Sequence, residues 1–267
     1  MSGGRFATLL LGCVPALLHG APQPEPMDWF GPWHGCALVV TRDRHRESRV
    51  EFGAQQCGVP LSPCSTFKIP NALIGLHEGA VSGPEHVKRW DGIIHAREVN
   101  NRDHDLASAI EHSVVWYFQS LARDIGADRM QSWLSALEYG NQNISSGIDR
   151  FWISGSLEIS AYQQLAFLKR LDHGVLPFRP RVQQQLRDML RQPSDLPGKL
   201  HGKTGSCRGR GEQPDHGWFI GWVDWHHGTD SNPETTWFVV NIRGDEAWGW
   251  KARSIALNIL NELHAKD

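Results

Sequence analysis

Residues 64 to 73 read CSTFKIPNAL and place Ser65 and Lys68 three positions apart, at what we predict to be the start of a helix. Side chains three residues apart lie on the same helical face, so the serine hydroxyl and the lysine amine are expected to touch. A serine is a weak nucleophile until a base takes its proton. Lysine can be that base when its amine is neutral, and burial beside Phe67 and Ile69 would lower its pKa. The stretch therefore predicts a nucleophilic serine beside its base.

Two later motifs strengthen this interpretation, because a Ser-x-x-Lys pair alone also fits a helix cap followed by a solvated lysine. The stretch HGKTGS (201–206) reads as a strand, in which Gly205 would let a ligand approach the backbone closely. On the same strand, Lys203 and Thr204 could hold a carboxylate. The stretch HSVV begins a helical run and offers the Ser113 hydroxyl as a proton relay. The three motifs together favour an active site over three unrelated structural residues.

Composition limits the kind of partner. The chain has 267 residues, of which 40% are hydrophobic and 21% charged, and it carries no repeat and no Gly/Ser-rich or Pro-rich linker. This composition is typical of one compact body with one or two subdomains. The net charge of -2 and a pI near 6.7 argue against a nucleic-acid or anionic membrane partner. We expect a small, roughly neutral ligand, and the twelve tryptophans are expected in the core or lining apolar pockets.

Strand patterns gather at the two ends of the sequence. They are GCALVV (35–40), RVEFG (49–53), GKLHGKTG (198–205), GWFIGWVDW (217–225) and TTWFVVNI (235–242). The connections between the last three are too short for crossover helices, so these strands are expected to be antiparallel.

The middle of the chain has helical periodicity. Four apolar residues follow the i, i+3, i+4, i+7 spacing of a buried helix face: Met130, Trp133, Leu134 and Leu137. Another helix is predicted to begin at Ser160, with Gln163 completing a capping box and Gly174 ending the helix. A last helix is predicted over residues 251–265.

These patterns predict an α/β (α+β) fold. Residues 22–64 and 197–267 would form an antiparallel sheet domain flanked by helices, and residues 65–196 an inserted, mostly helical domain. The active site would lie between the two domains.

The N-terminus has the pattern of a secretory signal peptide. Arg5 precedes an apolar run over 6–18, and small residues ending at Ala21 suggest cleavage after residues 1–21. The run is too short to span a bilayer, so the mature chain is predicted to be periplasmic and free of the membrane. A lipidation box ending at Cys13 is the alternative.

The combined motifs resemble the class D, oxacillinase-type serine β-lactamases. The resemblance extends from about Cys36 to the last helix and is carried by STFKIPNALIG, NRDHDLASAIEHSVVWYFQSLARDIG, YGN (139–141), FWISGSLEIS and KTG. The middle motif reads Ser113-Val114-Val115, whereas related penicillin-binding enzymes have a polar amide there. The resemblance implies the penicilloyl-serine transferase fold. It also implies hydrolysis of β-lactam antibiotics, and hence antibiotic resistance, through an acyl-serine intermediate.

The resemblance further implies that Lys68 is carboxylated by CO2 and acts as the general base. Val115 and the neighbouring apolar side chains would keep the amine dry and neutral. Trp152 matches the tryptophan whose indole N–H holds the resulting carbamate in this family, although a plain core tryptophan is the alternative. No metal ion and no other cofactor is implied.

The other roles also follow from the resemblance. Ser65 would attack the β-lactam carbonyl, and the backbone N–H groups of Ser65 and Ser206 would form the oxyanion hole. Ser113 would pass a proton to the leaving nitrogen, with Lys203 close enough to tune it.

The substrate carboxylate would meet Thr204 and an arginine. Arg253, in KARSIALNIL, is the first choice, and Arg243, in NIRGDE, is its rival because the alignment needs a one-residue gap.

Three alternatives to a hydrolase follow from the same residues. A β-lactam sensor domain and a penicillin-binding transpeptidase would both be acylated without rapid turnover. A metal enzyme is disfavoured, because His226 and His227 lie adjacent in a short polar stretch and no Cys/His set has ligand spacing.

Four cysteines follow the predicted signal peptide, which allows three disulfide pairings. Cys36 and Cys57 flank two strands of a predicted hairpin, which favours a bond between them. Cys64 and Cys207 would then pair, since each adjoins a motif of the same predicted site. A Cys57–Cys64 bond or two free buried thiols are the alternatives.

Overall fold

The computed structural model describes residues 28–209, 211, 214–225 and 234–265. The predicted signal peptide and the histidine pair at 226 and 227 lie outside these residues. Among the helices described, none combines the length and the apolar character needed to cross a membrane.

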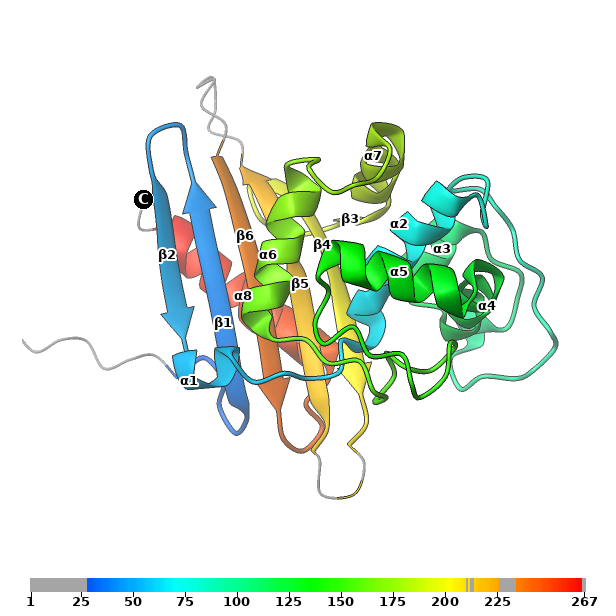
Figure 1. Ribbon diagram of the computed structural model, residues 1–267. Coiled ribbons are helices and arrows are strands. Elements are labelled where there is room, and N and C mark those ends of the chain that lie inside the picture. Colours follow the sequence, from blue (N-terminus) through cyan, green and yellow to red (C-terminus); the bar gives the residue numbers. More distant parts are fainter. Residues whose placement is uncertain (1–27, 210, 212–213, 226–233, 266–267) are drawn as a thin grey trace, which may run out of the picture.

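A six-stranded antiparallel sheet forms the centre of the molecule (Figure 1). Its order is β2-β1-β6-β5-β4-β3. The strands are β1 (His34–Arg42), β2 (Glu47–Phe52), β3 (Arg191–Gln192), β4 (Gly198–Cys207), β5 (His216–Trp225) and β6 (Glu234–Arg243). All five predicted strands are present, and the antiparallel pairing of the last three is confirmed. The two-residue β3 was not predicted, because so short a strand has no visible period.

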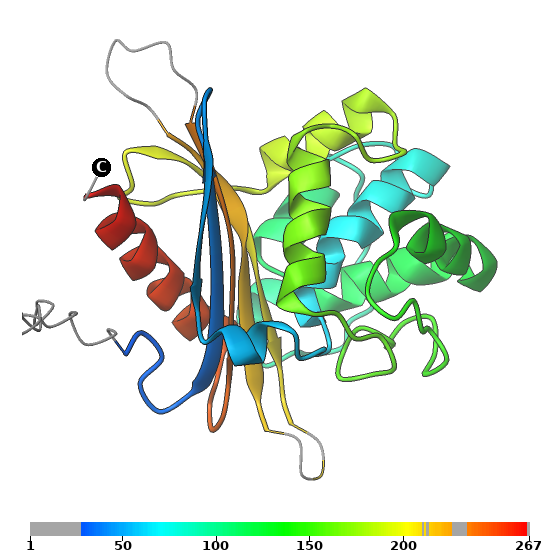
Figure 2. The same ribbon diagram turned by 60° about the vertical axis from the view of Figure 1, so that its left-hand side comes forward.

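Helices cover both faces of the sheet, as Figure 2 shows. The C-terminal helix α8 (Gly249–His264) packs on one face against β5 and β6. On the other face, α6 (Ala161–Asp172) packs against β6 and β1. Because both faces are covered, nearly every residue of β5 and β6 is buried. This explains the continuous apolar runs in their sequences.

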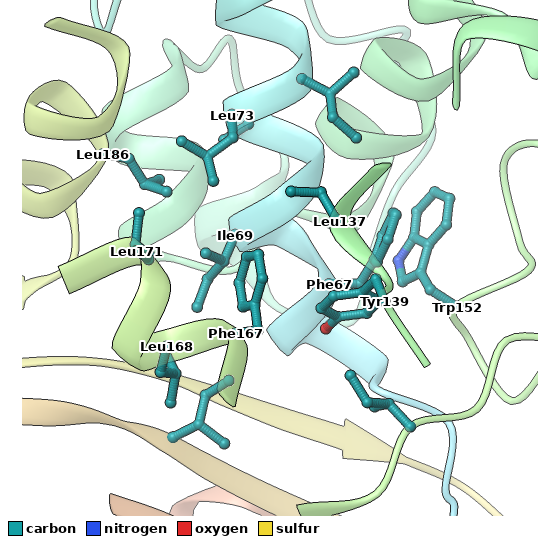
Figure 3. Close-up of a cluster of buried hydrophobic side chains, with 14 of the residues drawn as sticks. Phe67, Ile69, Leu73, Leu137, Tyr139, Trp152, Phe167, Leu168, Leu171 and Leu186 are labelled. Atoms are coloured by element: carbon teal, nitrogen blue, oxygen red, sulfur yellow. The ribbon is translucent and has the colours of Figure 1, made fainter. Parts of the chain in front are cut away.

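Apart from α1 (Ala54–Cys57), which packs against β1, the remaining helices form a layer beyond α6, at the β3 and β4 side of the sheet (Figure 1). They are η1 (Cys64–Phe67), α2 (Lys68–Glu78), η2 (Glu98–Asn100), α3 (Leu106–Glu111), α4 (Val115–Ile125), α5 (Ala127–Leu137) and α7 (Pro180–Met189). The central helix is α2, which packs against α4 and α7 and buries every residue from Lys68 to Leu76. In Figure 3, Ile69 and Leu73 of α2 lie in a cluster with side chains from α6 and α7. The first turn of α2 is therefore surrounded by packed side chains.

Sequence signals for individual helices are confirmed. The Ser160 side chain accepts a hydrogen bond from the Gln163 backbone, and the Gln163 side chain accepts one from the Ser160 backbone. Gly174 adopts a left-handed φ of 66° after this helix, as expected for a C-terminal glycine. On α5 the predicted face is buried at Met130, Leu134 and Leu137.

Candidate active site

The predicted nucleophile and base lie at the junction of η1 and α2. Ser65 belongs to the single turn of η1, and Lys68 is the first residue of α2. Lys68 Nζ donates a hydrogen bond of 2.6 Å to Ser65 Oγ. The spacing of the two residues therefore produces the contact that the sequence predicts.

The Lys68 amine is held in an apolar environment. Its side chain is 1% exposed, and Nζ lies 5.6 Å from the centre of the Phe118 ring. Burial lowers the Lys68 pKa well below its usual value, and the positive charges of Lys203 and Arg97 lower that pKa further. This environment favours the neutral amine, which is the form that can accept a proton or react as a nucleophile.

A second lysine and serine pair lies on the other side of the site. Lys203 Nζ donates a hydrogen bond of 3.0 Å to Ser113 Oγ and one of 3.2 Å to the Thr204 carbonyl. Burial, with a contribution from the Arg97 charge, lowers the Lys203 pKa to about 7. Ser113 precedes α4 with a left-handed φ of 58°, a conformation that is uncommon for a serine. Such strain is typical of residues held in place for function.

Gly205 brings β4 close to the turn that carries Ser65. A Cβ atom at this position would lie 2.9 Å from the Pro63 carbonyl oxygen and 3.2 Å from Thr66 Cγ2. The glycine was expected to admit a ligand, but what approaches it here is the protein's own backbone. Ser206, the next residue, accepts a hydrogen bond of 2.8 Å from the Gly249 backbone through its hydroxyl. β4 and the η1 turn that carries Ser65 are therefore in direct contact.

A cavity of about 610 Å³ opens above these groups. Its size is typical of a site for a small molecule. It is lined by Ser65, Arg97, Asn100, Ser113, Val115, Thr204, Ser206, Arg208, Trp248 and Trp250. Five of these residues were predicted from the sequence, and the structure brings them together from η1, α4, β4 and the segment before α4. The Trp250 side chain is 62% exposed at the cavity and offers a flat apolar surface.

Trp152 lies beside the nucleophile turn. Its side chain is buried, and its ring stacks on Phe67 with centres 5.2 Å apart (Figure 3). Its carbonyl accepts a hydrogen bond of 2.8 Å from Ser62 Oγ. Phe67 directly precedes Lys68, so Trp152 is packed against the segment that carries the predicted base.

The two arginines considered from sequence do not line the cavity that contains Ser65. Arg253 donates a hydrogen bond of 2.8 Å to the Pro193 carbonyl and lines a neighbouring cavity together with Lys203 and Thr204. Arg243 contacts the Gln56 side chain and lines a third cavity.

Two other arginines, Arg97 and Arg208, do line the Ser65 cavity. Neither was predicted from the sequence, because an arginine for the substrate carboxylate was sought only near the last helix. Arg208 stands two residues after Ser206, close to the KTG motif. This position was the sequence signal that could have identified it.

Comparison with known proteins identifies the family. The model of the penicillin-binding protein transpeptidase domain matches residues 36–261. A probable β-lactamase, YbxI of Bacillus subtilis, is 40% identical over 84% of this chain and 79% of its own length. The β-lactamase OXA-3 of Pseudomonas aeruginosa is 34% identical over 97% of this chain and 92% of its own length. The chain belongs to the class D β-lactamases.

Solved structures of class D β-lactamases share the fold. The enzyme from Bacillus subtilis superimposes with a TM-score of 0.78 at 38% identity, covering 88% of this chain and 93% of that structure. The enzyme FUS-1 (OXA-85) from Fusobacterium nucleatum gives a TM-score of 0.78 at 31% identity, covering 87% and 93%. The fold predicted from the sequence is thereby confirmed.

The cysteines of this class D β-lactamase form two pairs at disulfide distance. The Cα atoms of Cys36 and Cys57 are 5.1 Å apart, and those of Cys64 and Cys207 are 5.7 Å apart. The second pair joins the residue before Ser65 to the residue after Ser206.

A histidine completes this second group. The ligand atoms of Cys64, Cys207 and His216 all lie within 4.8 Å of one another. The sequence showed no Cys/His set with ligand spacing, because these residues come from η1, the end of β4 and the start of β5.

Proposed function

We propose that this protein hydrolyses β-lactam antibiotics through an acyl-enzyme formed on Ser65. The observation that carries the proposal is the 2.6 Å contact between Lys68 Nζ and Ser65 Oγ, made by a buried lysine whose pKa is lowered. Ser65 Oγ would attack the lactam carbonyl carbon, and the carbon–nitrogen bond of the ring would break. Water would then hydrolyse the resulting ester and release Ser65.

The residues around Lys68 fit carboxylation of its amine by CO2. The amine is dry and favours the neutral form, as carbamate formation requires, and Trp152 packs beside the same segment with an indole that can only donate. When carboxylated, the Lys68 side chain would supply a carboxylate-like base for Ser65 and later for water. Lys68 and Trp152 are thus the residues that we assign to this group.

The remaining predicted roles are supported by position. Ser65 and Ser206 both line the cavity on adjoining backbone segments, so their N–H groups are suitable donors to the developing oxyanion. The Ser113 hydroxyl receives a hydrogen bond from Lys203 and faces the same cavity. It would give its proton to the leaving nitrogen and recover one from Lys203. Val115 would form part of the apolar wall.

The substrate carboxylate is assigned to Thr204 together with a guanidinium. Arg97 and Arg208 line the cavity of Ser65, whereas Arg253 lines the neighbouring cavity, which Thr204 also lines. Arg208 is our first choice, because it follows Ser206 along the chain and its guanidinium lies 5.8 Å from the Trp248 ring at the cavity wall.

The organisation predicted from sequence is part of the same proposal. Residues 22–64 and 197–267 would form the sheet domain and residues 65–196 the helical domain, with the site between them. A signal peptide over 1–21 would export the chain to the periplasm, where both cysteine pairs would be oxidised.

A steady-state hydrolysis assay tests the proposal. Purified protein would be mixed with a penicillin, an oxacillin-type substrate and a carbapenem, and ring opening followed by absorbance. Sustained turnover supports the hydrolase. A single burst equal to the enzyme concentration, followed by no turnover of any of the three, would favour a sensor domain or a transpeptidase instead.

A further inference from the structure

A buried group of two sulfur atoms and one imidazole lies behind the active-site cavity. The exposed fractions are 2% for Cys64, 2% for Cys207 and 8% for His216. His216 Nε2 is 3.2 Å from Cys64 Sγ. Two thiolates and an imidazole are the ligands that zinc and other thiophilic cations prefer in proteins.

The His216 imidazole lies between two backbone carbonyls. The carbonyls of Ser62 and Pro214 accept hydrogen bonds from the imidazole, and the Ser62 oxygen lies 3.0 Å from Nε2. A histidine that binds a metal commonly donates its second ring N–H to a backbone carbonyl, which fixes the ring and its tautomer. With its proton on the other ring nitrogen, the imidazole could bind a cation through Nε2, and this bond would replace the contact between Nε2 and the Ser62 carbonyl oxygen.

An entry path leads to His216, one member of this group. A cavity of about 150 Å³ is lined by Ser62, His216, Arg208, Arg243 and Glu158, among others. It is large enough to hold water, which can act as the fourth ligand of a tetrahedral ion. Two thiolates would balance the charge of a divalent cation.

We propose that Cys64, Cys207 and His216 form a zinc site when the Cys64–Cys207 pair is reduced. A dithiol reductant gives two electrons and two protons to the disulfide and becomes a disulfide itself. Zn²⁺ then displaces the two thiol protons and binds both sulfurs and Nε2. This site is separate from the hydrolytic chemistry, which needs no metal.

The site would tie the same two segments together in either state. Cys64 directly precedes Ser65, and Cys207 directly follows Ser206. A covalent bond holds β4 to the serine turn when the pair is oxidised, and the ion would hold these segments when it is reduced. The distance between the sulfur atoms would grow to about 3.8 Å, as two zinc–sulfur bonds of about 2.3 Å at a tetrahedral angle require.

Metal stoichiometry tests the site on the full-length protein. One sample is reduced with a dithiol, freed of reductant under argon, given excess Zn²⁺ and passed through a desalting column, and an oxidised sample is treated in parallel. We expect about one tightly held zinc per reduced chain and none per oxidised chain. Equal zinc in both samples would overturn the proposal.

Two double variants separate this site from general thiol binding, because each retains one cysteine pair. The reduced Cys36→Ser/Cys57→Ser protein should still bind zinc, whereas the reduced Cys64→Ser/Cys207→Ser protein should not. The single variant His216→Gln should weaken zinc binding by about tenfold or more. Zinc retained by Cys64→Ser/Cys207→Ser, or full affinity in His216→Gln, would contradict the assignment.

X-ray absorption of the reduced, zinc-loaded wild-type protein gives a test that no variant's folding can affect. We expect two sulfur neighbours at about 2.3 Å and at least one nitrogen at about 2.0–2.1 Å. A zinc shell with only oxygen and nitrogen, or with four sulfurs, would reject the site.

Discussion

Lys203 Nζ lies 3.0 Å from Ser113 Oγ, although 90 residues separate the two along the chain. The lysine is buried and its pKa is about 7, so near neutral pH it exists in both protonation states. A donor with this property can return a proton to Ser113 after each turnover.

The charge of Arg97 is expected to contribute to the pH dependence of activity, in addition to the larger effect of burial. This charge lowers the pKa of Lys68 and of Lys203, so Arg97→Gln should raise both values. A smaller fraction of Lys68 would then be neutral at a given pH, and the rising limb of kcat against pH should move to higher pH. The control Arg97→Lys keeps the charge and should leave the limb near its wild-type position. A shift to lower pH in Arg97→Gln would contradict the assignment.

Ser65→Ala should reduce kcat by about 10³-fold or more while the protein remains folded, because no other group supplies the nucleophile. Mass spectrometry after brief exposure to a slow β-lactam should find one adduct, on the peptide that contains Ser65. Circular dichroism of the variant provides the folding control. An adduct elsewhere would show that another residue is acylated.

Activity should depend on dissolved CO2. Acidified and degassed enzyme should lose activity and recover it on addition of bicarbonate. Carbon-13 NMR with labelled bicarbonate should show a carbamate signal that is absent in Lys68→Ala. The variant Trp152→Phe keeps a ring against Phe67 but removes the N–H donor, so it should need more bicarbonate for half-maximal activity. Indifference to bicarbonate at low pH would count against carboxylation.

The arginine that binds the substrate carboxylate can be identified by KM. Arg208→Ala should raise KM by roughly tenfold or more, as expected for the loss of a charged hydrogen bond of about 1.5–3 kcal/mol. Arg253→Ala, which removes a side chain in the neighbouring cavity, serves as the matched comparison and should change KM less. The reverse order of effects would restore Arg253 to the role predicted from sequence.

The Cys64–Cys207 pair should be oxidised in protein recovered from the periplasm. Peptide mapping without reductant should join Cys64 to Cys207 and Cys36 to Cys57. Replacing Cys64 and Cys207 by serine should lower the free energy of unfolding by about 2–5 kcal/mol, measured by urea denaturation. Finding Cys57 joined to Cys64, or both Cys64 and Cys207 alkylated without reduction, would disprove the pairing.

Local patterns in the sequence predicted a large part of the fold. The strands were predictable because long apolar runs mark strands covered on both faces, as in β5 and β6. The capping box at Ser160 and the contact between Ser65 and Lys68 were predictable because each depends on spacing within one or two helical turns.

Features that depend on the approach of distant segments were not predictable in this way. The positions of Arg97 and Arg208 at the cavity follow from how loops pack around it, and no spacing in the sequence encodes that packing. The group of Cys64, Cys207 and His216 is assembled by the pairing of β4 with β5 and their contact with η1. The cavity that Arg253 lines depends on how α8 packs on the sheet.

The pairing of the first strand with the last has a consequence for folding. Val39 of β1 lies opposite Phe238 of β6, so this edge of β1 stays unpaired until nearly the whole chain has been synthesised. A hairpin of β1 and β2 can form early, but the sheet cannot be completed before β6 has been synthesised. Pairings between such distant segments slow folding, and an unpaired apolar strand invites aggregation. Chains truncated before residue 234 should therefore collect as aggregates rather than as partly active enzyme.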